Sequence, residues 1–170
     1  MPPASDLDPA LDPALDPALD PALDLVLERV VDVSPELVWR AWTEPKQLMQ
    51  WFTPVPWKTV ACDIDLRPGG GFRTVMRGPD GKENDSTGCY LEVVPNRRLV
   101  WTDALGPGYR PNANAFFTAI ITMESEGKGT RYRVVAKHRD PAGKTAHEEM
   151  GFHKGWGTAL DQLVALVKQG

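Results

Sequence analysis

Residues 130–168, TRYRVVAKHRDPAGKTAHEEMGFHKGWGTALDQLVALVK, decide the fold of this 170-residue chain. Over residues 130–138 the side chains alternate, which indicates a strand with one buried face and one solvated face. The predicted inner face carries Tyr132, Val134, Ala136 and His138. Over residues 144–168 apolar side chains recur at spacings of three and four, which predicts one long amphipathic helix. A one-faced strand followed by such a helix predicts a sheet packed against the helix.

Upstream of this stretch, alternating residues and turn signals predict the rest of the sheet. The five further strands are expected at 60–66, 72–77, 88–94, 99–103 and 115–124. Turns between them are indicated by PGGG at 68–71, GPDG at 78–81 and PN at 95–96. Consecutive strands joined by short turns pair in antiparallel fashion.

The start of the domain adds a strand and two short helices. Residues 25–33 are rich in β-branched and aliphatic residues, and Ser34 with Pro35 is typical of a helix start. Pro45 ends that helix, and a second short helix is expected over residues 48–52. The sequence therefore predicts an α+β helix-grip fold, in which a curved antiparallel sheet of about seven strands wraps around a long C-terminal helix.

The first 23 residues differ from the rest in composition. Residues 8–23 are four copies of Asp-Pro-Ala-Leu, and proline at every fourth position removes backbone donors. We expect a disordered acidic tail over residues 1–23 and one domain over residues 24–170. Six aspartates and no basic residue lie in the first 24 positions, so the total charge of −4 leaves +2 for residues 25–170. A domain so close to neutral does not predict nucleic-acid binding.

Composition and cysteine usage predict a cytoplasmic protein. The N-terminus lacks a basic segment followed by an apolar run, so we expect no secretory signal. No run of 18 apolar residues predicts a membrane span. Cys62 and Cys89 have no CxxC spacing and are interpreted as free thiols in a reducing compartment.

Motifs for catalysis or metal binding are not found in the sequence. The glycines at 69–71 precede a strand rather than a helix and lack the Lys-Ser/Thr ending of a phosphate loop. The histidines at 138, 147 and 153 have no accompanying cysteines at zinc-site spacing. No Gly-x-Ser-x-Gly elbow is present. We therefore predict no catalytic residue, no metal and no cofactor.

Aromatic residues at inward positions are the candidates for a ligand site. The predicted ligand-binding residues are Trp51, Phe72, Trp101, Phe117, Tyr132, His138, Phe152 and Trp156. Aromatic residues at core spacing also serve packing alone, so a filled core stays open as the alternative. Side-chain alternation along its strand places His138 on the inner face, where a ligand's polar group is expected to be its hydrogen-bond partner. The alternative is that the strand frays there and His138 lies in water.

Six segments carry a resemblance to a known family: WTEP at 42–45, WF at 51–52, DLRPGG at 65–70, GCYLEVVP at 88–95, RLVWT at 98–102 and GW at 155–156. Through these, residues 25–169 resemble the START-like superfamily, also called SRPBCC or birch-pollen-allergen-like. Within it they are similar to homologues of the C-terminal domain of the activator of heat-shock-protein-90 ATPase. The resemblance implies a helix-grip fold with a cavity between the sheet and the long helix.

The resemblance leaves three functions open. The first is binding of a small hydrophobic or amphipathic molecule in the internal cavity. The second is a protein-interaction, co-chaperone-like domain, and the third is a cyclase- or hydrolase-like enzyme. The sequence also leaves a homodimer open. Chaperone contact is not expected, because Asp-Pro-Ala-Leu copies stand where the activator has its chaperone-binding N-terminal domain.

Overall fold

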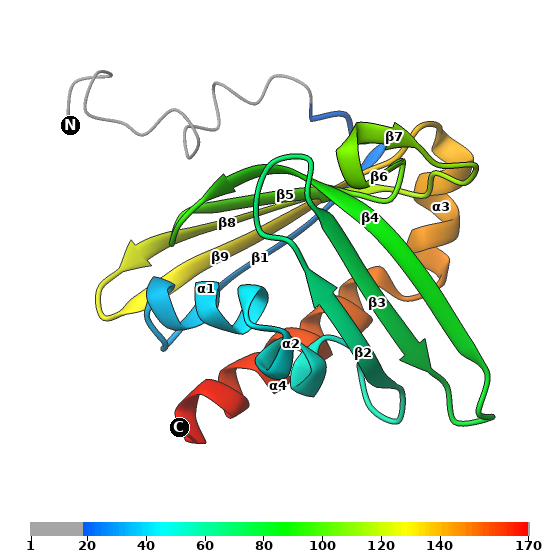
Figure 1. The fold of residues 1–170 in the computed structure, drawn as a ribbon. Helices are drawn as coiled ribbons and strands as arrows, with labels where there is room; N and C mark the ends of the chain where they lie inside the picture. Colours follow the sequence, from blue (N-terminus) through cyan, green and yellow to red (C-terminus); the bar gives the residue numbers. More distant parts are fainter. Residues whose placement is uncertain (1–18, 170) are drawn as a thin grey trace.

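The computed structural model describes residues 19–169, which form a seven-stranded antiparallel sheet curved around a C-terminal helix (Figure 1). The strand order is β1-β9-β8-β5-β4-β3-β2, and every neighbouring pair is antiparallel. The strands are β1 (Asp24–Val31), β2 (Lys58–Ile64), β3 (Gly71–Arg77), β4 (Glu83–Val94), β5 (Arg98–Thr102), β8 (Thr118–Glu126) and β9 (Gly129–Lys137). The fold predicted from the sequence is confirmed.

Helices α1 (Pro35–Thr43), α2 (Pro45–Trp51) and α4 (Phe152–Gln169) lie together on one side of the sheet (Figure 1). Their apolar faces meet the inward side chains of the strands in one core. Trp42, Leu48 and Leu163 are fully buried in it. Among residues 19–169, no helix is both long enough and apolar enough to cross a membrane.

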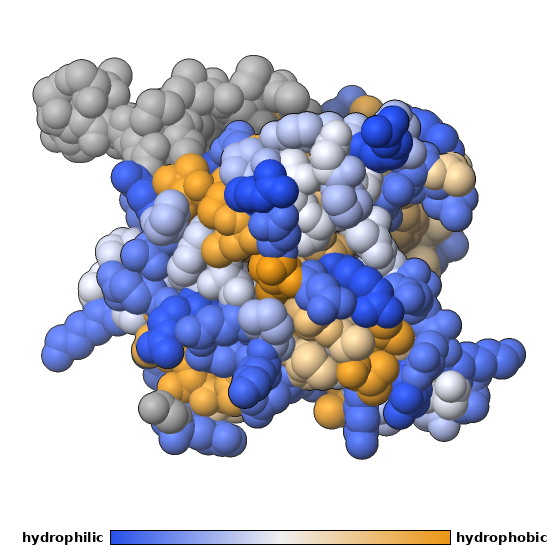
Figure 2. Space-filling view, in the orientation of Figure 1, coloured by the Kyte–Doolittle hydropathy of each residue, from blue (hydrophilic) through white to orange (hydrophobic). Residues whose placement is uncertain are grey.

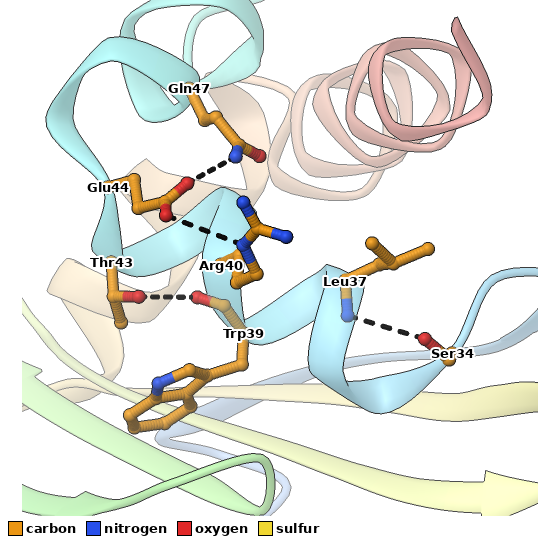
Figure 3. A network of polar contacts seen from close by, with 7 residues as sticks. All are labelled: Ser34, Leu37, Trp39, Arg40, Thr43, Glu44 and Gln47. Carbon is orange, nitrogen blue, oxygen red and sulfur yellow. Dashed lines mark hydrogen bonds and ion pairs between the residues drawn. The ribbon is translucent and has the colours of Figure 1, made fainter. Parts of the chain in front are cut away.

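The two short helices begin where the sequence predicts, for local reasons. The Ser34 hydroxyl accepts a hydrogen bond from the Leu37 backbone N–H at 3.4 Å, and Pro35 occupies the first helical turn (Figure 3). Arg40 pairs with Glu44 at the end of α1, where α2 begins. The indole N–H of Trp51 donates to the carbonyl of Ala41 at 2.9 Å. These contacts fix α2 against α1.

Strand β4 begins at Glu83, five residues earlier than predicted. Its first five residues, 83–87, are polar and exposed or half-buried, so they carry no apolar alternation. Pairing with β3 extends the strand instead, because Arg77 lies opposite Glu83 in the ladder. A small hairpin of β6 (Leu105–Gly106) and β7 (Arg110–Pro111), joined by the 3-10 turn η3 (Pro107–Tyr109), lies between β5 and β8.

The single long helix predicted over residues 144–168 is wrong. The chain forms α3 (Pro141–Glu149) and then α4, with a break at Met150 and Gly151. Gly151 has a φ of +92°, a left-handed conformation that ends a helix and favours glycine. Asp140 begins α3 by accepting a hydrogen bond from the Gly143 N–H at 2.8 Å. The apolar stripe of α4 starts at Phe152, after the break, and the sequence-based prediction extended it back over the mostly polar residues 144–149.

The predicted tail of residues 1–23 is described only from Leu19 onward, and residues 1–18 lie outside the described part. The last copy of the repeat, residues 20–23, forms a turn. The Asp20 carboxylate accepts from the Ala22 N–H at 2.8 Å, and the Asp20 carbonyl accepts from the Asp24 N–H at 2.8 Å. The Leu23 carbonyl accepts from the backbone N–H of His138 at 3.2 Å. The turn is therefore joined to the end of β9.

Both cysteines are free thiols. Cys89 is buried, and Cys62 is half-buried on β2. Burial, and secondarily the charge of Asp63, raise the pKa of the Cys62 thiol to about 11. The thiol is therefore protonated at neutral pH and has little nucleophilic character.

Candidate functional site

A partly open cavity of about 370 Å³ lies between the sheet and the junction of α3 with α4. Its walls come from β3, β4, β5, the segment after α2, and residues 147–159. Eight aromatic side chains line it: Trp51, Phe52, Phe72, Trp101, Phe116, Phe117, Phe152 and Trp156. Met150, which is 75% exposed, lies on its lining at the break between the helices.

Strands β3 and β4 form the floor of the cavity through side chains two residues apart. Three cross-strand pairs point to the same face: Phe72 with Gly88, Thr74 with Ser86, and Met76 with Asn84. Position 88 requires glycine, because a Cβ atom there would lie 2.4 Å from the carbonyl oxygen of Thr102. The floor therefore changes from aromatic to polar along the strands.

The structure brings six of the eight predicted ligand-binding residues to this cavity. They are Trp51, Phe72, Trp101, Phe117, Phe152 and Trp156. Tyr132 is not on the lining: it is buried in the main core, where its hydroxyl accepts a hydrogen bond from the indole N–H of Trp42 at 3.1 Å. His138 is also absent from the lining.

His138 lies buried behind the cavity wall, at the end of β9. It is 7% exposed, so the alternative that it lies in water is wrong. Its Nδ1 atom lies 2.7 Å from the carbonyl oxygen of Leu23, and its Nε2 atom lies 2.8 Å from Nδ1 of His147. Both ring nitrogens therefore have partners within the protein, and a ligand is not needed to satisfy them.

The two hydrogen bonds of His138 fix the protonation pattern of the pair when both rings are neutral. A carbonyl oxygen only accepts, so Nδ1 of His138 carries the proton that it donates to Leu23. Its Nε2 atom is then an acceptor, and Nδ1 of His147 donates to it. The remaining nitrogen, Nε2 of His147, is left with a free lone pair, and His147 lines the cavity.

His147 is held in its neutral form by its surroundings. The rings of Phe116 and Phe117 lie 4.7 Å from the imidazole, centroid to centroid, and the ring of Phe152 lies 5.1 Å away. Desolvation, and secondarily the charge of His138, lower the pKa of His147 to about 4. At neutral pH, His147 is therefore an uncharged hydrogen-bond acceptor.

Asp103 organises the segment that carries Phe116 and Phe117. One carboxylate oxygen accepts from the backbone N–H groups of Phe116 and Phe117, at 2.8 and 3.2 Å. Burial raises the pKa of Asp103, and these two hydrogen bonds oppose the shift. Asp103 thereby positions the two phenylalanine rings that pack against His147.

Sequence reasoning missed His147, Asp103 and Phe116. The sequence pattern gives little indication of their roles. His147 lies on a helix that the prediction joined to α4, and Asp103 stands at the end of a predicted strand, where side chains are usually exposed to solvent.

The third histidine, His153, lies on the exposed side of α4, with Nε2 at 3.2 Å from the Val26 carbonyl. Within residues 19–169, no three His, Cys, Asp or Glu side chains gather in a metal-binding group.

Comparison with known proteins places this architecture in a family. The family model described as Activator of Hsp90 ATPase homolog 1-like protein matches residues 32–168. A solved structure of a protein from Nitrosomonas europaea is 48% identical, with a TM-score of 0.87, and the match covers 89% of this chain and 97% of that chain. A protein from Aeromonas hydrophila, described as AHSA1-like, shares the fold at 23% identity and a TM-score of 0.64, over 86% of this chain and 93% of that one. None of the curated proteins matches the chain.

Proposed function

This chain belongs to the family of Activator of Hsp90 ATPase homolog 1-like proteins, and from its cavity we propose that it binds a small hydrophobic or amphipathic molecule. The observation that carries the proposal is a cavity of about 370 Å³ with eight aromatic side chains on its walls. Ligand sites are typically apolar clefts of about 300–1,000 Å³ with a few placed polar groups.

Packing alone does not explain such a cavity. Protein interiors are close-packed, and unfilled space among large side chains costs stability. Here Trp51, Trp101 and Trp156 surround the space instead of filling it. Gly88 and Gly155, which have no side chain, also face it. The polar groups on the lining include Ser86, with His147 on the far side, as an amphipathic ligand requires.

The histidine pair favours an enzyme as the second candidate. A buried imidazole supported by a second imidazole is an arrangement that general bases use. A base is most effective when its pKa is close to the working pH, and the pKa of His147 is lowered to about 4. His147 is therefore better suited to accept a hydrogen bond than to remove a proton, and binding ranks first.

The surface gives less support to a protein-interaction domain. On the face shown in Figure 2, apolar residues form separate patches divided by hydrophilic ones. Large apolar side chains that are exposed are dispersed along the chain: Val30 lies on β1, and Val55 lies in the segment between α2 and β2. Interaction sites usually present one contiguous apolar patch.

The two free thiols support the cytoplasmic location expected from the sequence.

The proposal is tested by blocking the cavity from its floor. Ser86→Phe places a ring in the cavity, whereas Thr87→Phe places the same ring on the opposite face of β4. Calorimetric titration of the parent protein with 2-methoxynaphthalene, a neutral apolar probe, should show binding. The binding should be lost in Ser86→Phe and kept in Thr87→Phe. Native mass spectrometry of the freshly purified parent should show a co-purified small molecule, and equal binding by both variants would contradict the proposal.

A further inference from the structure

We propose that the ligand is an uncharged aromatic molecule with a hydroxyl group, and that Nε2 of His147 accepts the hydrogen bond of that hydroxyl. The inference rests on the proposed function and names the class of molecule that the cavity selects. It follows from three properties of the lining. A hydrogen-bond acceptor of His147 faces the cavity, no lysine or arginine of residues 19–169 lines it, and its walls are aromatic.

The acceptor is set by residues outside the cavity. The Leu23 carbonyl requires a proton on Nδ1 of His138, and His138 in turn requires a proton on Nδ1 of His147. Nε2 of His147 is therefore unprotonated in the neutral pair. No residue within 19–169 donates a hydrogen bond to this atom. A ligand hydroxyl supplies the missing donor.

The lining is unsuited to an anion. No lysine or arginine of residues 19–169 lines the cavity, and the one charged lining side chain is the carboxylate of Asp103. A ligand carboxylate here loses its hydration without gaining a cationic partner, and it meets the His147 lone pair and Asp103. Burying an unpaired charge in this way is unfavourable. A fatty acid or an aromatic acid is therefore selected against.

A cation is also less favoured than a neutral hydroxyl. One oxygen of Asp103 already accepts two backbone hydrogen bonds, from Phe116 and Phe117. These two hydrogen bonds already compensate part of the carboxylate charge, and no second carboxylate of residues 19–169 lines the cavity to help hold a cation. The walls instead present ring faces and edges, which pack well against a flat aromatic ligand.

Three naphthalene probes and two variants test the inference. 2-Naphthol has the donor, 2-methoxynaphthalene has the same rings without it, and 2-naphthoate carries the anion. His147→Asn keeps an amide N–H in the place of Nδ1 to donate to His138, but has no acceptor at the position of Nε2, because its amide oxygen takes the place of Cδ2. His153→Asn makes the same change at an exposed position of α4.

Calorimetric titration of the parent should show 2-naphthol binding about three- to tenfold more tightly than 2-methoxynaphthalene, the range of one neutral hydrogen bond. 2-Naphthoate should bind at least about tenfold more weakly than 2-naphthol. The preference for 2-naphthol should disappear in His147→Asn and persist in His153→Asn. Equal affinity of the parent for the hydroxyl and methoxy probes, or a preference that survives in His147→Asn, would overturn the inference while leaving the proposed function intact. If none of the three probes binds, the proposed function fails and the inference with it.

A measurement on the ligand-free protein does not depend on the variants. Nitrogen-15 chemical shifts of the imidazole rings distinguish the two neutral tautomers. Both His138 and His147 should be protonated at Nδ1 at neutral pH. A His147 ring protonated at Nε2 would overturn the inference directly.

Discussion

The Nε2 atom of His138 lies 2.8 Å from the Nδ1 atom of His147, which is nine residues later in the chain. The contact joins the end of β9 to α3, and both side chains are 7% exposed. Phenylalanine rings surround the pair, so a proton added to it places a charge in an apolar region. Protonation of His147 is therefore unfavourable in the folded protein.

Stability should fall between pH 7.5 and pH 5 because of His147. Its pKa is about 4 in the folded protein and 6.5 in the unfolded chain, so the unfolded state binds more protons in this window. The stability is fully present above pH 6.5 and is lost as the pH falls toward 4. We expect the free energy of unfolding, measured with urea, to drop by on the order of 2 kcal/mol over this interval.

The variant His147→Asn separates this effect from other titrations. It lacks the titrating ring, so its stability should depend much less on pH over the same window. His138 and Asp103 adjoin or line the same cavity and are retained in both proteins. An equal loss of stability in parent and variant would show that His147 is not the responsible group.

Removing the Tyr132 hydroxyl should destabilise the core. Tyr132→Phe leaves the buried indole N–H of Trp42 without its acceptor, which costs about 1–3 kcal/mol. Tyr90→Phe is the matched control, because the buried hydroxyl of Tyr90 has no hydrogen-bond partner in residues 19–169. Chemical denaturation should show a clear loss for Tyr132→Phe and little loss or a gain for Tyr90→Phe. The reverse order would refute this account of the two hydroxyls.

Leu163 should hold α4 against the sheet. Its side chain is fully buried in the main core, so Leu163→Ala should cost about 2–5 kcal/mol. Lys154 lies on the exposed side of the same helix, and Lys154→Ala should be nearly neutral. Thermal unfolding of the two variants tests the assignment of helix faces. Similar melting temperatures would mean that the faces are assigned wrongly.

The break between α3 and α4 should depend on glycine at position 151. Gly151→Ala forces a side chain into a left-handed conformation, at a cost of about 1–2 kcal/mol. Gly155 lies inside α4, and a Cβ atom there would make an ordinary contact with Pro54 at 3.8 Å. Gly155→Ala should therefore raise helix stability by up to about 1 kcal/mol. Urea denaturation should show a lower free energy of unfolding for Gly151→Ala and a higher one for Gly155→Ala. Two losses of equal size would contradict the role of the break.

The turn at residues 20–23 should contribute to stability. A chain that begins at Leu19 should melt within about 2 °C of the full chain, since the domain contacts of the turn are kept. A chain that begins at Asp24 loses the Leu23 carbonyl, which accepts from the backbone and the ring of His138. Losing two hydrogen bonds, about 2 kcal/mol in total, should lower the melting temperature by about 4–8 °C. Calorimetry that finds the two truncated chains equally stable would show that the turn contributes nothing.

The sequence by itself determined the order and type of most elements. Alternation over residues 130–138 predicts β9, and Ser34 with Pro35 predicts the start of α1. Both signals are local, because one-sided burial of a strand and capping of a helix depend on residues that are close together in the sequence. The structure confirms the curved sheet around a C-terminal helix. Side-chain alternation along the strand also predicts that His138 points inward, and it is buried in the structure.

Only the tertiary structure decided where the C-terminal helix breaks and what the histidines contact. Gly151, Gly155 and Gly157 look alike in the sequence, yet one is left-handed and two are helical. The partners of His138 come from Leu23 and His147, which lie on separate elements. The spacing of apolar residues in the sequence indicates which side of a helix or strand is buried. A hydrogen bond also depends on the distance and direction between two elements, which packing of the whole chain sets.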